Sequence, residues 1–335
     1  MLITWILAGA AVVALLVAVF LVLGRRSGSS AGREPQMRAL HAVDEPADDL
    51  PAEASPRGAV TLPETQSSLD IDIVDPTLPD EEEEPTGPTP RILVTAVGQT
   101  DAGRRRKHNE DAYLVLPSHS LFAIADGMGG YAAGEVASQM AIDCITTSFQ
   151  TGQFGGAPIE GLPRRGDELV RAIQSANAAI LSQARANEAQ AGMGTTLVAA
   201  RFSPNRNRVY IAHVGDSRLY RMRGDELSQL TVDHTLGAMG ISGPSASKLS
   251  RAVGVFDEVE VDLSVDEPQR GDFYVLCSDG LSKMVPEPAI AELLRGEGDL
   301  DAIVKKLIDE ANERGGKDNV SVILIRVDEP DLSRS

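Results

Sequence analysis

Aspartates at the ends of short apolar runs are the residues of this chain best suited to do chemistry. The run Leu121–Ala125 leads directly into Asp126, and Gly127-Met128-Gly129-Gly130 follows it. A carboxylate at the end of a strand, beside a glycine whose carbonyl oxygen stays accessible, provides the oxygen donors that hard divalent cations prefer. Asp126 and Gly127 are therefore candidate metal ligands.

A dinucleotide-binding turn is one alternative explanation for this strand and its glycines. That motif also needs a third glycine at a fixed spacing and an acid at the end of a second strand about 20 residues later. Here Tyr131 and Ala132 follow the glycines, and the acid in range, Asp143, falls within a helical pattern. The residues thus argue against a dinucleotide site, which leaves a glycine-rich turn with an incidental aspartate as the plainer alternative.

Acidic turns of the same kind recur along the chain, and an incidental aspartate would not explain this. Each lies directly before or after a run typical of a strand, and the acids concerned are Glu110, Asp111, Asp216, Asp279 and Asp318. A single acid at the end of a strand is usually a solvated turn residue. The repetition predicts instead that these carboxylates converge. The basic run Arg104–Lys107 suggests that the site holds cations and an anion together.

Six motifs in a fixed order give residues Leu93 to Val327 a strong resemblance to a known family, the metal-dependent serine/threonine protein phosphatases of the protein phosphatase 2C (PPM) type, in its bacterial form. The motifs are Arg-x-x-Asn-Glu-Asp, Asp-Gly-Met-Gly-Gly, Gly-Met-Gly-Thr-Thr, Gly-Asp-Ser-Arg, Ser-Asp-Gly and Gly-Gly-Lys-Asp-Asn-Val. The resemblance implies an α+β fold, a four-layer α-β-β-α sandwich with two central antiparallel sheets. It also implies a binuclear metal centre at one end of the sandwich.

The resemblance assigns a role to each candidate residue. The direct ligands of two Mn²⁺ or Mg²⁺ ions would be Asp126, the Gly127 carbonyl, Asp279 and Asp318. Glu110 and Asp111 would bind metal directly or through water, and a coordinated water would attack phosphorus. Arg106 matches the arginine that grips the phosphate, since its planar fork suits two phosphoryl oxygens. Asp216 matches an acid that helps to hold a third ion in bacterial relatives, and a plain turn aspartate is an equal alternative.

The chain departs from the family pattern at two places. Met128 stands where many eukaryotic members carry a histidine, the proposed proton donor to the leaving group, so protonation must come from water or another group. Residues 236–249 are shorter than the mobile flap of many bacterial relatives, and three glycines and a proline favour a loop there. We expect this loop to leave the metal centre more open and less able to support a third ion through Asp216.

Hydrophobic periodicity supports the same fold independently of the motifs. Apolar residues recur at helical intervals over 135–149, 168–189 and 300–313. Strand-like runs cover 92–99, 112–116, 121–125, 196–201, 209–214, 219–223, 273–277 and 320–327. Strands in meander order with helices between groups suit a layered sandwich better than alternating βα units.

The N-terminal segment predicts a membrane anchor. Leu2–Leu23 comprises 22 residues without a charge, enough at about 1.5 Å per residue to cross a hydrocarbon core of about 30 Å. No basic residue precedes it and no small-residue cleavage site ends it, which favours an uncleaved anchor over a signal peptide. Because Arg25 and Arg26 follow, the positive-inside rule predicts a single-pass protein of the inner (cytoplasmic) membrane with its catalytic domain in the cytoplasm.

Most of the acidity of the chain lies in a segment that is not expected to fold. The net charge is −18, and residues 27–90, rich in proline, contribute −12 of it through 15 acids and three arginines. This balance argues against nucleic-acid binding, and two cysteines in unlike elements give no reason to expect a disulfide. The predicted organisation is an anchor with its basic flank (1–26), a disordered acidic linker (27–90), a phosphatase domain (91–328) and a tail (329–335).

The sequence therefore predicts a membrane-tethered phosphatase that removes phosphate from phosphoserine and phosphothreonine in phosphorylated proteins. A Ser/Thr kinase as the opposing partner is implied by the family and not by these residues. A non-catalytic phosphoprotein-binding or scaffold module on the same fold is the main alternative, and a phosphatase of small phosphorylated molecules is another. The presence of every expected acid and of Arg106 disfavours the scaffold.

Overall fold

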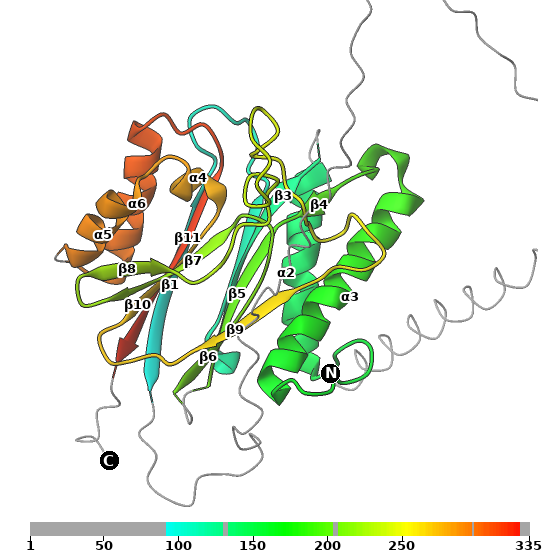
Figure 1. The fold of residues 1–335 in the computed structure, drawn as a ribbon, viewed down its shortest axis with the longest axis horizontal. Coiled ribbons are helices and arrows are strands. Elements are labelled where there is room, and N and C mark those ends of the chain that lie inside the picture. Colours follow the sequence, from blue (N-terminus) through cyan, green and yellow to red (C-terminus); the bar gives the residue numbers. More distant parts are fainter. Residues whose placement is uncertain (1–91, 130–132, 204–206, 297, 329–335) are drawn as a thin grey trace, which may run out of the picture. The chain divides into compact units, whose positions relative to one another are not determined.

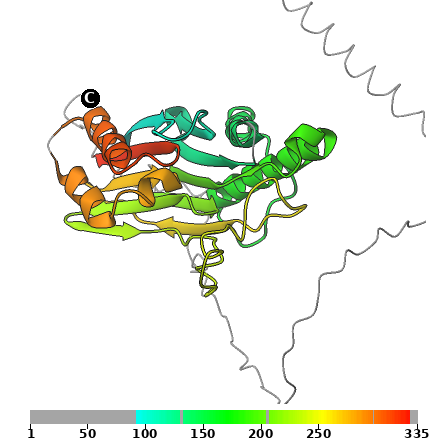
Figure 2. The same ribbon diagram turned by 90° about the horizontal axis from the view of Figure 1, so that it is seen from above.

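Two antiparallel β-sheets pack face to face, and a pair of helices covers the outer face of each (Figures 1 and 2). The computed structural model describes residues 92–129, 133–203, 207–296 and 298–328. The predicted α+β sandwich with two central antiparallel sheets is confirmed. The predicted anchor (1–26), linker (27–90) and tail (329–335) lie outside the described residues. Within the described ranges, no helix is both long and apolar enough to cross a bilayer.

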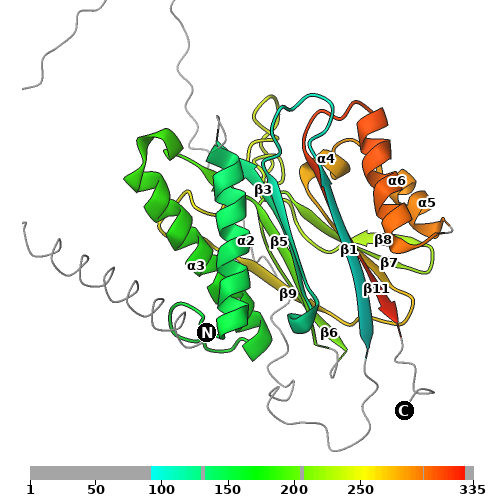
Figure 3. The ribbon, with the colours of Figure 1, turned by 180° about the vertical axis from the view of Figure 1, so that it is seen from behind.

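The first sheet joins the two ends of the described chain. Its first and last strands lie side by side in Figure 3, paired in register from Leu93 opposite Asp328 to Asp101 opposite Val320. The strand order is β1 (Leu93–Asp101), β11 (Val320–Asp328), β10 (Phe273–Cys277), β7 (Arg218–Arg223) and β8 (Glu226–Gln229).

The second sheet carries the strand that leads into Asp126. Its order is β2 (Asp111–Leu116), β3 (Leu121–Met128), β5 (Leu197–Ser203), β6 (Arg208–Val214) and β9 (Asp262–Asp266), and the short β4 (Gly194–Thr195) pairs with the end of β3. All pairings are antiparallel among the strands that the structure describes, so the dinucleotide-binding alternative, which needs a parallel sheet, is excluded.

Helices cover the outer face of each sheet. On the second sheet lie α2 (Ala133–Thr151) and α3 (Arg164–Ala186), and on the first lie α5 (Glu287–Arg295) and α6 (Leu300–Glu313). A single turn, α4 (Asp279–Ser282), follows β10, and one-turn 3-10 helices occupy Pro117–His119 and Glu188–Gln190. The three predicted helices are confirmed, and α6 has the predicted bounds. Strands β8 and β9 and helix α5 were not predicted.

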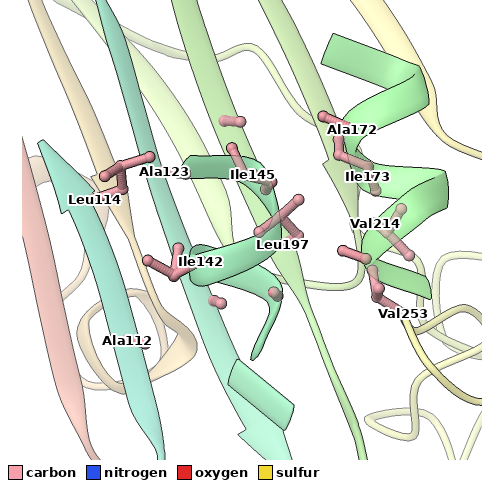
Figure 4. Packing of buried hydrophobic residues seen from close by; sticks show 14 of the residues in the cluster. Ala112, Leu114, Ala123, Ile142, Ile145, Ala172, Ile173, Leu197, Val214 and Val253 are labelled. Atoms are coloured by element: carbon pink, nitrogen blue, oxygen red, sulfur yellow. The ribbon is translucent and has the colours of Figure 1, made fainter. Parts of the chain in front are cut away.

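Alternation of side chains explains why the central strands are almost continuously apolar. Along β11, Ile323 faces the other sheet, whereas Val322 and Leu324 face the helices. Because successive residues of a strand point to opposite faces and both faces are covered, nearly every position is buried. Figure 4 shows the outer core of the second sheet, where Ile145 of α2 and Ile173 of α3 are buried against it. Each such side chain contributes about 2 kcal/mol through burial.

Candidate metal centre and active site

The predicted site residues meet around one cavity at the end of the sandwich. The cavity has a volume of about 370 Å³, and the sequence-predicted residues that line it are Arg106, Glu110, Asp126, Gly127, Asp216, Asp279 and Asp318. They come from loops and strand ends that are far apart in the sequence. A larger cavity of about 500 Å³ lies beside the end of α3, but Glu188 is the one acid in its lining, so it cannot be the site of this chemistry.

Asp111 lies directly behind this lining, where two serines hold it. Its Oδ2 accepts hydrogen bonds from Ser278 Oγ at 2.8 Å and from Ser321 Oγ at 2.7 Å. Its Oδ1 is buried and has no hydrogen-bond partner among the residues that the structure describes. A buried carboxylate oxygen without a partner is costly, so a cation at this point would fit the site. Sequence reasoning gave neither serine a role.

Gly127 allows two segments of backbone to approach Asp126 closely. A Cβ atom at this position would lie 2.1 Å from the carbonyl oxygen of Gly134 and 2.6 Å from that of Glu110. The Gly127 amide donates a hydrogen bond to the Glu110 oxygen at 3.0 Å. Any other residue would push the Glu110 loop and the start of α2 away from the site.

The acids Asp216 and Asp279 share a lysine that the sequence reasoning missed. Asp216 lies in the turn between β6 and β7, and Asp279 begins α4. Lys283, which follows α4, donates from Nζ to Asp216 Oδ2 at 2.9 Å and to Asp279 Oδ2 at 2.5 Å. The available signal was the i,i+4 spacing of Asp279 and Lys283, which brings two side chains together on a helical turn.

The loop before β2 is held in place by Asn319 of the last acidic motif. Asn319 accepts a hydrogen bond from the Glu110 amide at 2.8 Å and donates to the carbonyl oxygens of Ala102 at 3.0 Å and His108 at 2.9 Å. This loop carries Arg106, whose guanidinium donates a hydrogen bond to Asp318 Oδ2 at 2.8 Å. That hydrogen bond raises the pKa of Arg106. Arg106 is half exposed, so it can reach a ligand entering the cavity.

Three carboxylates of the cluster, Asp111, Asp126 and Asp279, have raised pKa values and therefore favour the binding of protons or cations. Burial, followed by repulsion from Asp111 and Asp279, raises the pKa of Asp126 well above its usual range. Burial raises the pKa of Asp111 to about 7 even though the two serines oppose the shift. The pKa of Asp279 also rises through burial, in spite of Lys283. Divalent cations would relieve both the burial and the repulsion.

Two histidines of the described residues, His213 and His234, are hydrogen-bonded within the protein. His234 Nε2 lies 3.1 Å from Asp262 Oδ2, and its Nδ1 accepts a hydrogen bond from the Gly215 amide. The ring of His213 stacks on it with centroids 4.6 Å apart. Together with Asp262 these rings have ligand atoms close enough for a metal, but Arg251 already occupies the other oxygen of Asp262 and would repel a cation.

The stretch 236–249 forms turns and no helix, which confirms the predicted loop. Its two halves pair through hydrogen bonds from the Leu236 amide to Lys248 and from the Gly237 amide to Ala246. Ser247 and Leu249 nevertheless line the cavity. The loop is therefore short yet still forms part of the cavity wall.

Comparisons with known proteins agree with this geometry. The family model described as protein phosphatase 2C matches residues 99–324. The serine/threonine phosphatase stp of Listeria innocua is 38% identical over 243 residues, which cover 68% of this chain and 93% of that protein. PstP of Mycobacterium tuberculosis is 35% identical over 255 residues, covering 73% of this chain and 47% of that protein.

Solved structures show the same fold. The catalytic domain of PstP in complex with two manganese ions is 36% identical, with a TM-score of 0.61, and the match covers 71% of this chain and all of that one. A serine/threonine phosphatase of S. agalactiae is 31% identical with a TM-score of 0.63, covering 70% of this chain and 99% of that one. The chain therefore belongs to the protein phosphatase 2C family and is a serine/threonine protein phosphatase.

Proposed function

We propose that the acidic cluster holds the two Mn²⁺ or Mg²⁺ ions on which phosphatases of this family depend. The observation that carries this proposal is the convergence of five separate acidic segments on one cavity. The oxygen-only donor set suits these hard ions. The unpartnered Oδ1 of Asp111 and the raised pKa of Asp126 indicate missing positive charge. The proposed ligands are Glu110, Asp111, Asp126, the Gly127 carbonyl, Asp279 and Asp318.

The protein's own residues in this centre bind and orient the phosphate. When bound, such ions acidify a coordinated water and stabilise charge on phosphoryl oxygens. Arg106 offers the free part of its guanidinium to the phosphate, while its bond to Asp318 fixes its position at the rim. The side chain of Asn319 donates to backbone carbonyl oxygens on both sides of Arg106 and so holds the Arg106 loop in place beside the cluster. No described histidine lines the cavity, in keeping with Met128 at its edge, so the leaving oxygen takes its proton from water or another group.

A catalytic centre accounts for the structure better than a scaffold does. A module that only bound phosphoproteins would not need several carboxylates buried beside one another, because such an arrangement disfavours an anionic ligand unless metals are present. The substrates we propose are phosphoserine and phosphothreonine in proteins, with a Ser/Thr kinase as the opposing enzyme. Arg106 and Lys283 line the cavity and are half exposed, so the cavity opens to solvent, as access by a protein substrate requires.

We further propose that residues 1–26 anchor the enzyme in the inner membrane and that residues 27–90 form a flexible tether to the domain at 91–328. The support is the uncharged run Leu2–Leu23, the basic pair Arg25 and Arg26 and the acidic composition of the tether. A flexible chain of this length has a root-mean-square reach of about 45 Å. The tether would thus hold the catalytic domain close to phosphorylated membrane proteins.

The activity proposal is tested by incubating residues 92–335 with a panel of phosphopeptides. We expect release of phosphate from phosphoserine and phosphothreonine peptides with Mn²⁺ or Mg²⁺ and none in chelator. Phosphotyrosine peptides and small phosphomonoesters are the controls. Faster turnover of the small esters than of every peptide would instead identify a phosphatase of small molecules. Tight binding of phosphopeptides without release of phosphate would identify a scaffold.

The location is tested separately with a reporter that is active only in the cytoplasm, fused after Ser335. We expect signal from the full chain, membrane fractionation of that chain, and a soluble active product after deletion of residues 1–26. Access of external protease to the C-terminus in intact cells would refute the orientation. Recovery of the full chain in the soluble fraction would refute the anchor.

A further inference from the structure

Lys283 occupies the space between two acids of the cluster. Its ammonium group lies within hydrogen-bond distance of Asp216 Oδ2 and Asp279 Oδ2 at the same time. The two carboxylates are largely buried, with side-chain exposures of 6% for Asp216 and 18% for Asp279, whereas the lysine reaches them from the solvent side. The bond to Asp279 spans one helical turn, so α4 presets the position of the ammonium group.

A divalent ion that bridged Asp216 and Asp279 would have to displace this ammonium group. Lys283 is bonded to the Oδ2 atom of each carboxylate and lies between them, and an ammonium group offers three donors but no acceptor with which to bind a metal. Two cations at contact distance also repel strongly in a partly buried site. Asp216 makes no other side-chain ion pair among the described residues, so Lys283 accounts for its charge.

The charges of the centre balance with two divalent ions and not with three. The six acids Glu110, Asp111, Asp126, Asp216, Asp279 and Asp318 carry six negative charges when ionised. Arg106 and Lys283, which pair directly with three of them, return two positive charges. Two divalent ions neutralise what remains. A third would leave an excess of positive charge unless Lys283 withdrew.

We propose that Lys283 is a built-in cation that takes the place of a third metal ion between Asp216 and Asp279, so that this enzyme saturates with two. The inference concerns the metal centre proposed above and rests on it. Lys283 is thus a positioning residue, since it holds the two carboxylates and limits how many ions they accept. It is not assigned contact with the phosphate.

The test is the number of Mn²⁺ ions bound per full-length chain, measured by equilibrium dialysis and calorimetry. The native chain should bind two ions at the centre. The Lys283→Gln variant should bind a third ion, or should bind its weakest-bound Mn²⁺ ion at least about tenfold more tightly than the native chain does. The third ion should disappear again in Lys283→Gln with Asp216→Asn, because that change removes one of its two carboxylates. Lys283→Arg, which keeps the charge, should remain at two.

Lys306→Gln is the matched control, since it removes one positive charge from the exposed face of α6 and should leave the stoichiometry at two. A circular dichroism spectrum of each variant shows that it is folded. Three ions in the native chain, or unchanged stoichiometry and affinities in folded Lys283→Gln, would overturn the role of Lys283. Failure of the native chain to bind Mn²⁺ at all would instead overturn the proposed metal centre, so the two failures are distinguishable.

Discussion

Asp111 and Asp126 lie directly opposite each other, in register, on the neighbouring strands β2 and β3. Like charges at opposed positions of a sheet destabilise it. Burial strengthens the repulsion between these two carboxylates, because it removes the water that would screen their charges. The folded sheet can hold Asp111 beside Asp126 only if bound protons or cations neutralise their charge. The stability of the domain therefore depends on pH and on the concentration of divalent cations.

This coupling predicts how the metal-free domain responds to pH. The folded pKa of Asp111 is about 7, above its ordinary value of 3.8. The folded state therefore binds the proton more tightly, and the stabilisation is full below pH 3.8 and is lost as the pH rises through about 7. The loss amounts to about 4 kcal/mol at most.

The measurement is the Tm in chelator at several pH values, for the native domain and for Asp111→Asn. We expect the Tm of the native domain to fall relative to that of the variant between pH 4 and about pH 7. Carboxylates far from Asp111 titrate alike in both proteins and cancel in the difference. Asp126 does not cancel, because its pKa is raised by repulsion from Asp111 and that repulsion is lost in the variant, so the relative decline reports the coupled pair. Excess Mn²⁺ should abolish the relative decline, and parallel curves in chelator would contradict the prediction.

Removal of one ligand charge should disable the enzyme. Asp126→Asn and Asp279→Asn each take an anionic oxygen from the cluster, so Mn²⁺ affinity should fall and kcat should drop by at least about a hundredfold. Asp301→Asn, an exposed position in the first turn of α6, is the control and should behave as the native enzyme. Activity of the native enzyme in chelator, or full activity of either site variant, would rule out the metal-dependent mechanism.

Arg106→Ala should act mainly on substrate binding. If Arg106 grips the phosphate in the ground state, its loss removes a charge-assisted hydrogen bond, and KM should rise about tenfold, more than kcat falls. The neighbouring Arg105→Ala removes an exposed guanidinium that makes no side-chain hydrogen bond to any of the described residues, so it is a matched control. An unchanged KM in Arg106→Ala would remove this residue from phosphate binding.

The short loop 236–249 should give the isolated domain little peptide selectivity. Ser247 and Leu249 line the cavity, but their loop has no helix with which to read an extended peptide. We expect kcat/KM values for dissimilar phosphothreonine peptides to lie within about tenfold, or about 1.4 kcal/mol. A spread of several orders of magnitude would show that the loop recognises the peptide sequence. In that case Leu249→Ala should reduce the spread of kcat/KM values.

The order of the motifs along the sequence was enough to identify the family, the fold and every acid that lines the cavity. Motifs of this kind can be recognised locally, because each acid lies within two residues of a strand end. The 3.6-residue period of α6 and the apolar runs of β10 and β11 are likewise local, and both were predicted closely.

Elements that are stable only through their neighbours could not be predicted from sequence. Strand β9 reads Asp-Leu-Ser-Val-Asp and has little strand character of its own, but its pairing with β6 satisfies its backbone. Strand β8 is short and polar, and α5 spans nine residues with a proline near its start. Local patterns in such short segments are too weak to distinguish them from loops.

The partners of the acids were decided by tertiary structure alone. Whether Ser278 and Ser321 meet Asp111 depends on the alignment of β10 and β11 with β2, which belongs to the other sheet. Whether Lys283 reaches Asp216 depends on how α4 lies against the turn between β6 and β7. The sequence therefore determined which groups carry charge, and packing determined which charges meet, because contacts between distant segments depend on how sheets and helices stack.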